Sequence, residues 1–342
     1  MKKAVRILFL LLLIATCIIG WLFFGPATGF KGKEKYLYIP TDNATKEKML
    51  QLLEKDSLVT RLYVFSIVAN RVNYWKNIKP GKYKISSGDN IVSIVRRLKN
   101  GHQEPVNLII TKLRLKEDLA SMIGKRFECD STSFMHFLLN RDTLAAYNLD
   151  SNTIMTTVFP ETYTYFWNTT PSRIFHKLYA QYKNFWTTER RQQAAAHSLT
   201  PATAYILASI VEEETIKNDE KPLIASAYLN RMAKGMKLGA DPTVKYALRD
   251  FGLKRIYFKY ITAAAASPYN TYTHTGLPPG PICTPTRETL EAVLNAASTD
   301  YLFFCARPDF SGYHAFASNE KEHFKNAKAY QEALNQRTGN SQ

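Results

Sequence analysis

The longest apolar segment of the chain lies at its N-terminus. Lys2, Lys3 and Arg6 precede an apolar run from Ile7 to Gly25 that only Thr16 interrupts. As a helix, this run is long enough to cross a hydrocarbon core of about 30 Å. Positive charge before the run and a long polar chain after it predict an inner-membrane anchor at 7–25, with residues 1–6 in the cytoplasm.

A cleaved signal peptide is the alternative interpretation of this segment. Signal peptides have a shorter apolar region that ends in a small-residue cleavage site. Here Trp21, Leu22, Phe23 and Phe24 occupy that end. These bulky residues favour an uncleaved, single-pass anchor that leaves most of the chain on the periplasmic side.

Between Tyr36 and Thr111, short strand-like and helix-like patterns follow one another closely. Strands are expected at Tyr36–Ile39, Gly81–Ile85 and Val106–Ile110, and helices after caps at Asn43 and Asn90. The second helix has an apolar face from Ile91 to Leu98 and ends at Gly101. This domain, residues 36–111, resembles the LysM-like modules that bind amino-sugar glycans. A spacer domain without glycan affinity is the alternative.

Residues 112–342 have the pattern of a larger domain. Expected there are helices at Leu113–Ile123, Phe134–Leu139, Leu223–Met232 and Glu322–Asn335, loops at Phe159–Tyr163 and Gly239–Pro285, and strands at Tyr301–Phe304 and His314–Phe316. Helices and strands do not alternate as βαβ units, and no Gly-rich nucleotide fingerprint is present. The expected fold class is therefore α+β: an N-terminal transmembrane helix, a small LysM-like domain and a larger α+β domain.

One carboxyl group falls on the apolar face of a predicted helix in this larger domain. The helix begins after Thr200, and Leu207, Ile210 and Val211 follow the i, i+3, i+4 pattern. Glu214 continues that stripe at i+7 from Leu207, near its centre. The alternative is that the stripe has ended and Glu214 reaches water at the helix terminus.

A carboxyl group that lies against apolar neighbours resists ionisation. The pKa of Glu214 is therefore expected to rise from about 4.3 toward about 6 or 7. Glu212 and Glu213 are expected to turn away from the apolar stripe. A carboxyl that stays protonated near neutral pH is the acid that glycosidic-bond cleavage requires.

The net charge of +16 bears on the choice of partner. It indicates an anionic environment, such as phospholipid headgroups, a polyanionic wall polymer or nucleic acid. The basic residues are dispersed and form no run typical of a nucleic-acid arm, and the external location argues against nucleic acid. Seven histidines without HExxH spacing predict no metal site, and no cofactor is expected. The cysteines show no CxxC spacing, and a Cys283–Cys305 bridge stays open.

Three further segments carry more polar and aromatic groups than a turn requires. Asp241 lies in a proline-fixed turn, able to cap a helix or face a cleft. Tyr269, Asn270 and Tyr272 place two aromatic faces beside amide and hydroxyl groups, which suits a sugar ring. Gly276–Ile282 is a stiff loop that cannot join a sheet interior. A helix cap, a core aromatic pair and a surface turn are the structural alternatives.

Together these segments resemble the endolytic murein transglycosylase family, the membrane-anchored YceG-like proteins. The similar stretches, in family order, are Ala208–Thr215, Leu229–Arg231, Asp241–Thr243, Tyr269–Tyr272 and Gly276–Pro281, with Phe159–Tyr163 and Gly312–Phe316 fitting more loosely. The resemblance covers nearly the whole chain. The family's catalytic glutamate falls on Glu214, and Asp241, Tyr269, Asn270 and Tyr272 are the candidates for positioning the substrate.

Two positions depart from the family pattern. Gly239 stands where a polar residue is frequent, which puts one substrate contact in doubt. Glu161 replaces the commoner aspartate of the Phe-Pro-Asp-Thr-Tyr-like motif. Neither departure affects Glu214.

The resemblance implies cleavage of the bond between N-acetylmuramic acid and N-acetylglucosamine within nascent peptidoglycan strands. The products carry 1,6-anhydro ends, and cleavage terminates strand elongation. Glu214 protonates the glycosidic oxygen and then takes the proton of the sugar's C6 hydroxyl, which attacks C1. The resemblance also implies association with peptidoglycan synthases, although no residue identifies a docking surface.

Two other functions fit parts of this pattern. A hydrolase with two carboxylates would pair Glu214 with Asp241 or Glu161, and its products would be heavier by one water. A non-catalytic scaffold would bind peptidoglycan through its small domain and release no soluble product.

Overall fold

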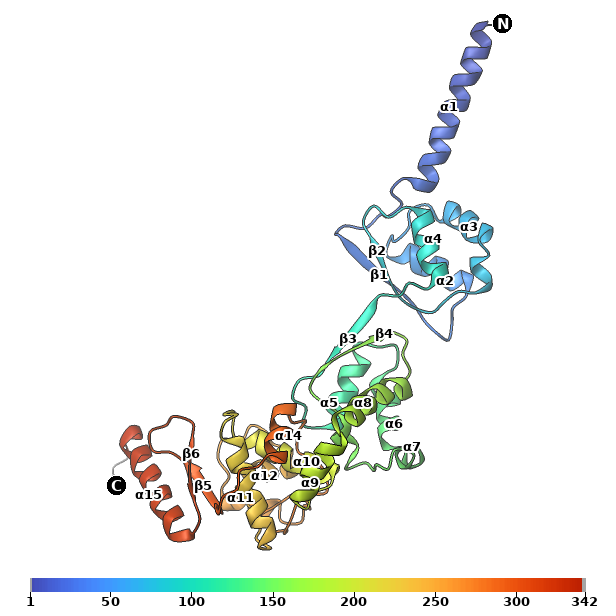
Figure 1. The fold of residues 1–342 in the computed structure, drawn as a ribbon. Helices are drawn as coiled ribbons and strands as arrows, with labels where there is room; N and C mark the ends of the chain where they lie inside the picture. Colours follow the sequence, from blue (N-terminus) through green and yellow to red (C-terminus); the bar gives the residue numbers. More distant parts are fainter. Residues whose placement is uncertain (1, 340–342) are drawn as a thin grey trace. The chain divides into compact units, whose positions relative to one another are not determined.

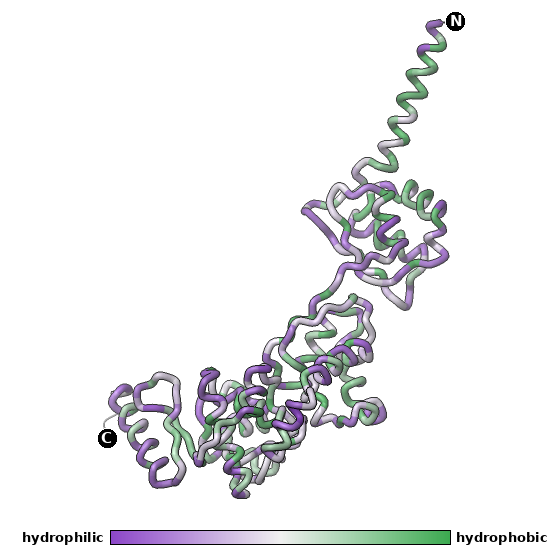
Figure 2. Tube along the Cα trace, viewed as in Figure 1, coloured by the Kyte–Doolittle hydropathy of each residue, from purple (hydrophilic) through white to green (hydrophobic). Residues whose placement is uncertain are grey.

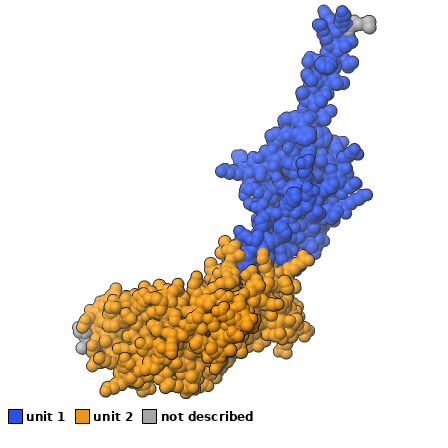
Figure 3. All heavy atoms as spheres, viewed as in Figure 1, with its two compact units in different colours: residues 1–108, 123–130, 163–170 blue, residues 109–122, 131–162, 171–342 orange. Residues whose placement is uncertain are grey.

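The computed structural model describes residues 2–339 and divides them into two compact units. Unit 1 takes the chain up to residue 108 together with 123–130 and 163–170, and unit 2 takes 109–122, 131–162 and the chain from 171 onward (Figures 1 and 3). In the described part of the chain, the strands pair as three two-stranded sheets. Helices make up most of the rest, so the fold is mixed α and β.

The N-terminal helix α1 (Lys2–Phe24) contains the predicted anchor. Hydrophobic residues occupy most of its length (Figure 2), and none of its residues is buried within the structure. By length and composition α1 is a candidate membrane span. Helices α9 (Thr188–Ala196) and α10 (Pro201–Glu214) meet the same criterion only as a pair bent by 70°.

Unit 1 is built around the antiparallel pair β1 (Glu34–Ile39) and β2 (Gly81–Ser86), in which Leu37 lies opposite Tyr83. Both of these side chains are buried. The other elements are α2 (Lys46–Lys55), α3 (Leu62–Arg71), η1 (Tyr74–Lys76), α4 (Ile91–Asn100) and β3 (Pro105–Ile109), which pairs with β4 (Thr162–Phe166). Asn90 caps α4 and Gly101 ends it with φ of 73°, as the sequence predicts.

Three local expectations are wrong. The cap of α2 is Thr45, not Asn43, because the helix begins at Lys46 and the Thr45 hydroxyl accepts from the Lys48 amide. The segment 159–163 is not all loop, since β4 begins at Thr162. The loop-rich stretch 239–285 contains two helices, α12 (Asp241–Leu248) and α13 (Phe258–Ala263). Pro242 starts α12 rather than fixing a turn, because the first helical turn does not need its missing N–H.

Unit 2 holds the larger helical assembly. Its remaining elements are α5 (Lys116–Gly124), α6 (Ser131–Leu139), α7 (Arg141–Ala145), η2 (Ile154–Thr157), α8 (Pro171–Phe185), α11 (Lys221–Ala233), α14 (Arg287–Leu294), β5 (Phe303–Ala306), β6 (His314–Ala317) and α15 (Glu320–Thr338). Strands β5 and β6 are antiparallel, with Phe304 opposite Phe316. Helix α15 contacts this pair.

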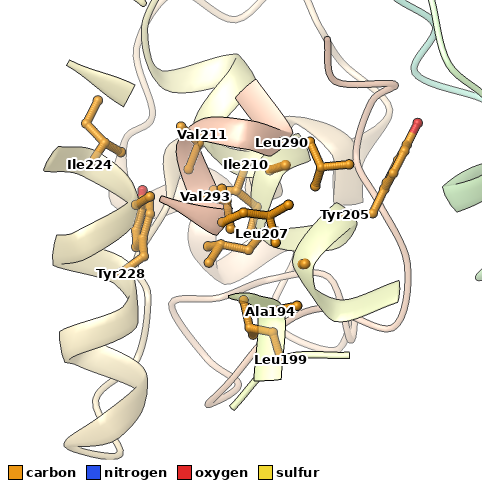
Figure 4. Packing of buried hydrophobic residues seen from close by; sticks show 14 of the residues in the cluster. Ala194, Leu199, Tyr205, Leu207, Ile210, Val211, Ile224, Tyr228, Leu290 and Val293 are labelled. Atoms are coloured by element: carbon orange, nitrogen blue, oxygen red, sulfur yellow. The ribbon is translucent and has the colours of Figure 1, made fainter. Parts of the chain in front are cut away.

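Helix α10 is the centre of unit 2. Thr200 caps it through a reciprocal box with Thr203. Every residue from 204 to 211 is buried, and α9, α11, α12 and α14 all contact the helix (Figure 4). The single apolar stripe expected from the sequence therefore underestimates the burial of α10, because residues 204–211 are covered on all faces of the helix.

Leu207→Ala is expected to lower the free energy of unfolding by about 2–5 kcal/mol, because the Leu207 side chain is fully buried in this cluster. Urea unfolding of the full chain in detergent, followed by the fluorescence of Trp186 in the same cluster, measures this loss. Leu139→Ala is the matched control, because Leu139 is 48% exposed. Equal losses in the two variants would contradict the central position of α10.

Candidate active site

Glu214 is the last residue of α10 and lies in the wall of an open cleft of about 630 Å³. The hydroxyl of Tyr228, on α11, donates a hydrogen bond to Glu214 Oε1 at 2.5 Å. Tyr228 also lines the cleft. The carboxyl is thus fixed by one neutral donor at the border between the helical core and the cleft.

Burial raises the pKa of Glu214 to about 7. The hydrogen bond from Tyr228 opposes this rise because it stabilises the charged carboxylate, whereas the negative charge of Asp241 adds to it. Lys245 has a smaller lowering effect. The resulting value falls in the range expected from the sequence, so a substantial fraction of this carboxyl group is protonated near neutral pH.

The two glutamates before Glu214 point to other sides of α10, but those sides are covered as well. Glu212 accepts hydrogen bonds from Thr289 and Thr286 of the α14 segment and forms a buried ion pair with Lys221 at 3.3 Å. Burial raises the pKa of Glu212, but the Thr289 hydroxyl and the Lys221 ammonium together hold it below its usual value. This carboxyl is therefore ionised and structural.

Glu213 is also neutralised by cations. Arg114 contacts its Oε2 at 2.9 Å and Lys112 contacts its Oε1 at 3.4 Å. Glu214 differs from both neighbours because no ion pair is formed with it among the described residues. Of three consecutive carboxyl groups, the last alone combines burial, a neutral donor and access to the cleft.

Two of the predicted substrate-binding residues lie in the same cleft as Glu214. Asp241 is the first residue of α12, and Tyr272 donates a hydrogen bond to Asp241 Oδ1 at 2.6 Å. Burial raises the pKa of Tyr272, so its hydroxyl stays protonated and remains a donor. Asp241 and Tyr272 thus form one hydrogen-bonded pair in the cleft wall.

The other two predicted residues lie outside this cleft. Asn270 is completely buried. Its amide donates to the carbonyl of Ile261 at 2.9 Å, and its Oδ1 accepts from the backbone amide of Tyr272 at 3.0 Å. Tyr269 packs against Tyr246, with 4.6 Å between ring centroids. Asn270 therefore shapes the turn that presents Tyr272, and Tyr269 faces a different cavity.

The cleft contains further residues that were not among the predicted site. They are Tyr228, Arg231, Lys237, Phe303, Phe304, Cys305, Ala306, His314, Glu320, His323 and Phe324, together with Gly239. Arg231 and His314 fall within stretches that resemble the family, so the resemblance pointed to their segments but not to their roles. The sequence could not identify Tyr228 as a residue of the site, because a tyrosine on a predicted helix does not indicate which side chain it contacts.

His314 is held by a buried carboxylate. Glu220 is 3% exposed and accepts from the His314 backbone amide at 2.6 Å, and its other oxygen lies 3.0 Å from Nδ1 of the ring. This contact ties β6 to the start of α11 and fixes the imidazole in the cleft wall. Cys305, also in the wall, and Cys283 are both free thiols, so the bridge that the sequence left open is absent.

The cleft thus contains one buried carboxyl group whose pKa lies near neutrality, which is the property that a general acid in glycosidic-bond cleavage needs. The model of the YceG-like family matches residues 37–329, and the chain belongs to that family. The family recognised from the sequence is thereby confirmed.

Several known proteins are similar to this chain. The endolytic murein transglycosylase of Bacillus subtilis (strain 168) is 32% identical over 180 residues, which are 53% of this chain and 49% of that protein. The protein of the same name from Streptococcus pneumoniae is 26% identical over 311 residues, 80% of this chain and 54% of that protein. The chain spans about half the length of these curated relatives. The crystal structure of a YceG-like protein from Listeria monocytogenes covers 86% of this chain and 98% of its own, with 25% identity and a TM-score of 0.57.

Tyr228→Phe and Asp241→Asn are expected to move the pKa of Glu214 in opposite directions. Loss of the Tyr228 hydroxyl removes a donor to the carboxylate and raises the pKa, whereas loss of the Asp241 charge lowers it. Titration of the ¹³C-labelled Glu214 carboxyl by NMR, assigned by its absence in Glu214→Gln, measures both. Shifts of the same sign would show that these two residues do not control the ionisation.

Glu214→Gln is expected to stabilise the chain in alkaline but not in acidic solution. The folded-state pKa of Glu214, about 7, lies above the reference value of 4.5, so the folded state opposes ionisation. As pH rises, the wild type therefore loses free energy of unfolding: the loss is absent below the reference value, grows up to the folded-state pKa and is constant above it. Urea midpoints of the two proteins should therefore coincide near pH 4.5 and separate above pH 7. A gap of constant size across that range would contradict the raised pKa.

Proposed function

We propose that this chain is an endolytic lytic transglycosylase. It cleaves the bond between N-acetylmuramic acid and N-acetylglucosamine within peptidoglycan strands and leaves 1,6-anhydro ends, which terminates elongation of nascent strands. The observation that carries this proposal is the Glu214 carboxyl, which burial keeps protonated beside an open cleft. The names of the curated relatives support the same activity.

The proposed reaction uses one carboxyl group twice. Glu214 donates its proton to the glycosidic oxygen while the bond from C1 to that oxygen breaks, and the leaving sugar departs with a hydroxyl group. The Glu214 carboxylate then accepts the proton of the C6 hydroxyl as O6 bonds to C1. The carboxyl is regenerated and no water is consumed.

Tyr228 supports both halves of this cycle. Its pKa is raised, first by burial, so the hydroxyl remains a donor while Glu214 is charged. This hydrogen bond stabilises the carboxylate that exists between the two proton transfers. Asp241 and Tyr272, in the same cleft wall, are proposed to position the strand, and Asn270 acts by holding the turn that carries Tyr272.

A two-carboxylate hydrolase is the second candidate, because Asp241 shares the cleft with Glu214. Glu161, the other acid considered from the sequence, forms an ion pair with Arg287 and does not line the cleft. Hydrolysis adds one water to each product, so product mass separates the two reactions. A non-catalytic scaffold would not need a buried acid in an open cleft.

The membrane and glycan-binding roles complete the proposal. Helix α1 is proposed to anchor the chain in the inner membrane as a single pass, with the remainder on the periplasmic side. Residues 36–111 are proposed as a LysM-like module and residues 112–342 as the catalytic domain. The β1–β2 pair with its covering helices supports the first of these assignments. Peptidoglycan synthases are the proposed protein partners.

Glu214→Gln is expected to reduce the release of anhydro-ended muropeptides from purified sacculi by a factor of about 100 or more, because the amide cannot donate the required proton. Liquid chromatography with mass spectrometry measures these products. Glu332→Gln, which removes an exposed carboxyl on α15, is the control and should keep full activity. Wild-type product levels from Glu214→Gln, or products heavier by one water from the wild type, would overturn the mechanism.

A further inference from the structure

A second cavity in unit 2 contains Tyr269, the predicted substrate-binding residue that lies outside the Glu214 cleft. Its volume is about 200 Å³. The residues that matter for its chemistry are Tyr246, Tyr269, Lys116, Arg249, Ser151 and Asn152. We call this cavity the tyrosine subsite.

The tyrosine subsite and the Glu214 cleft are built from the same two segments. Helix α12 provides Asp241 to the cleft and Tyr246 to the subsite, and the turn after α13 provides Tyr272 to the cleft and Tyr269 to the subsite. In the cleft the two segments are joined by the hydrogen bond from Tyr272 to Asp241. In the subsite they are joined by the contact between the rings of Tyr246 and Tyr269. Asp241 and Tyr246 are five residues apart, which corresponds to a rise of about 7.5 Å along the axis of α12.

The walls of the subsite combine aromatic faces with polar groups. The rings of Tyr246 and Tyr269 are tilted by 39° and are only partly buried. A sugar has apolar ring faces and a polar edge, and such a surface suits it. Gly280 closes one side, because a Cβ atom there would lie 2.3 Å from the Asn152 carbonyl oxygen and 2.8 Å from the Tyr269 hydroxyl.

Two cations at this cavity indicate the kind of sugar. Lys116 Nζ donates to the carbonyl oxygen of Ser151 at 3.2 Å, which leaves donor capacity. Arg249 pairs through Nη2 with Glu117, which also lines the cavity, at 3.1 Å. The Arg249 side chain is 62% exposed, and its other N–H groups can donate to a further acceptor. An ammonium and a guanidinium beside an aromatic platform fit an amino sugar whose attached peptide carries a carboxylate.

We propose that the tyrosine subsite binds a further amino-sugar unit of the strand that the Glu214 cleft cleaves, with Lys116 and Arg249 contacting a carboxylate of the peptide attached to that unit. This inference rests on the proposed function. It gives the cleft a second point of attachment on the same strand, so that a chain interior is held in place during cleavage.

The test removes charge from the protein and, separately, from the substrate. The full chain in detergent carries the double substitution Lys116→Gln and Arg249→Gln, and kcat/KM is measured on native glycan strands and on strands whose carboxyl groups have been amidated. The kcat/KM of the variant is expected to fall roughly tenfold on native strands, mainly because KM rises. On amidated strands kcat/KM is expected to fall less than about twofold. Arg173→Gln with Lys183→Gln, two exposed cations of α8, removes the same charge elsewhere and should match the wild type on both.

Tyr269→Leu is the second variant and removes the aromatic face without changing charge. It is expected to raise KM on both substrates with kcat unchanged. The proposal is overturned if kcat/KM of the double variant falls by the same factor on both substrates. It is also overturned if neither variant differs from the control variant in kcat/KM. Failure of Glu214→Gln to abolish cleavage overturns the proposed function instead, so the two failures are distinct.

Discussion

The burial of α10 on every face is the constraint on which the rest of unit 2 depends. Residues 204–211 of α10 are all buried, and the helix then ends in three consecutive, partly buried glutamates. Each carboxyl must therefore find its own compensation within the protein. Glu212 forms an ion pair with a lysine and accepts hydrogen bonds from two threonines. Glu213 forms ion pairs with an arginine and a lysine. Glu214 accepts a hydrogen bond from a tyrosine hydroxyl, and its pKa rises to about 7 instead.

This constraint explains why the three carboxyl groups differ in their ability to exchange a proton near neutral pH. An ion pair fixes a carboxylate in its charged form, because separating the two charges in a buried setting is unfavourable. A carboxyl that is buried beside a neutral donor can exist in both forms near neutral pH. Only the second situation permits proton transfer in both directions. The contrast between Glu212 and Glu214 is thus a contrast between a carboxyl with a lowered pKa and one with a raised pKa within one helical turn.

The sequence was sufficient for features that depend on neighbouring residues. The helix start at Thr200, the cap at Asn90 and the end of α4 at Gly101 are local, and each was predicted correctly. Glu214 was selected by helical periodicity, although the single-stripe premise underestimated the burial of α10. The selection succeeded because any position near the end of a fully buried helix is poorly solvated unless a cation reaches it.

Contacts between distant segments could not be predicted in this way. Tyr228 reaches Glu214 from the next helix, and Glu220 reaches His314 across 94 positions of the chain. Nothing in the composition of either segment specifies its partner, since such pairs are fixed by tertiary packing. Local pattern also could not show that the residues of the turn at 269–272 face different surroundings. Its four residues look equivalent as a sugar-binding motif, but alternate residues of a turn face different surroundings, and Asn270 is absorbed into the core.

The position of Asn270 shows how a buried amide can serve an open cleft without lining it. Its two hydrogen bonds join the end of α13 to the backbone at Tyr272, so the turn has one conformation. That conformation sends Tyr272 toward Asp241 and Tyr269 toward Tyr246. Loss of the amide would leave a backbone donor and a carbonyl unpaired in the interior, which is unfavourable. Two cavities therefore depend on one residue that contributes to the lining of neither.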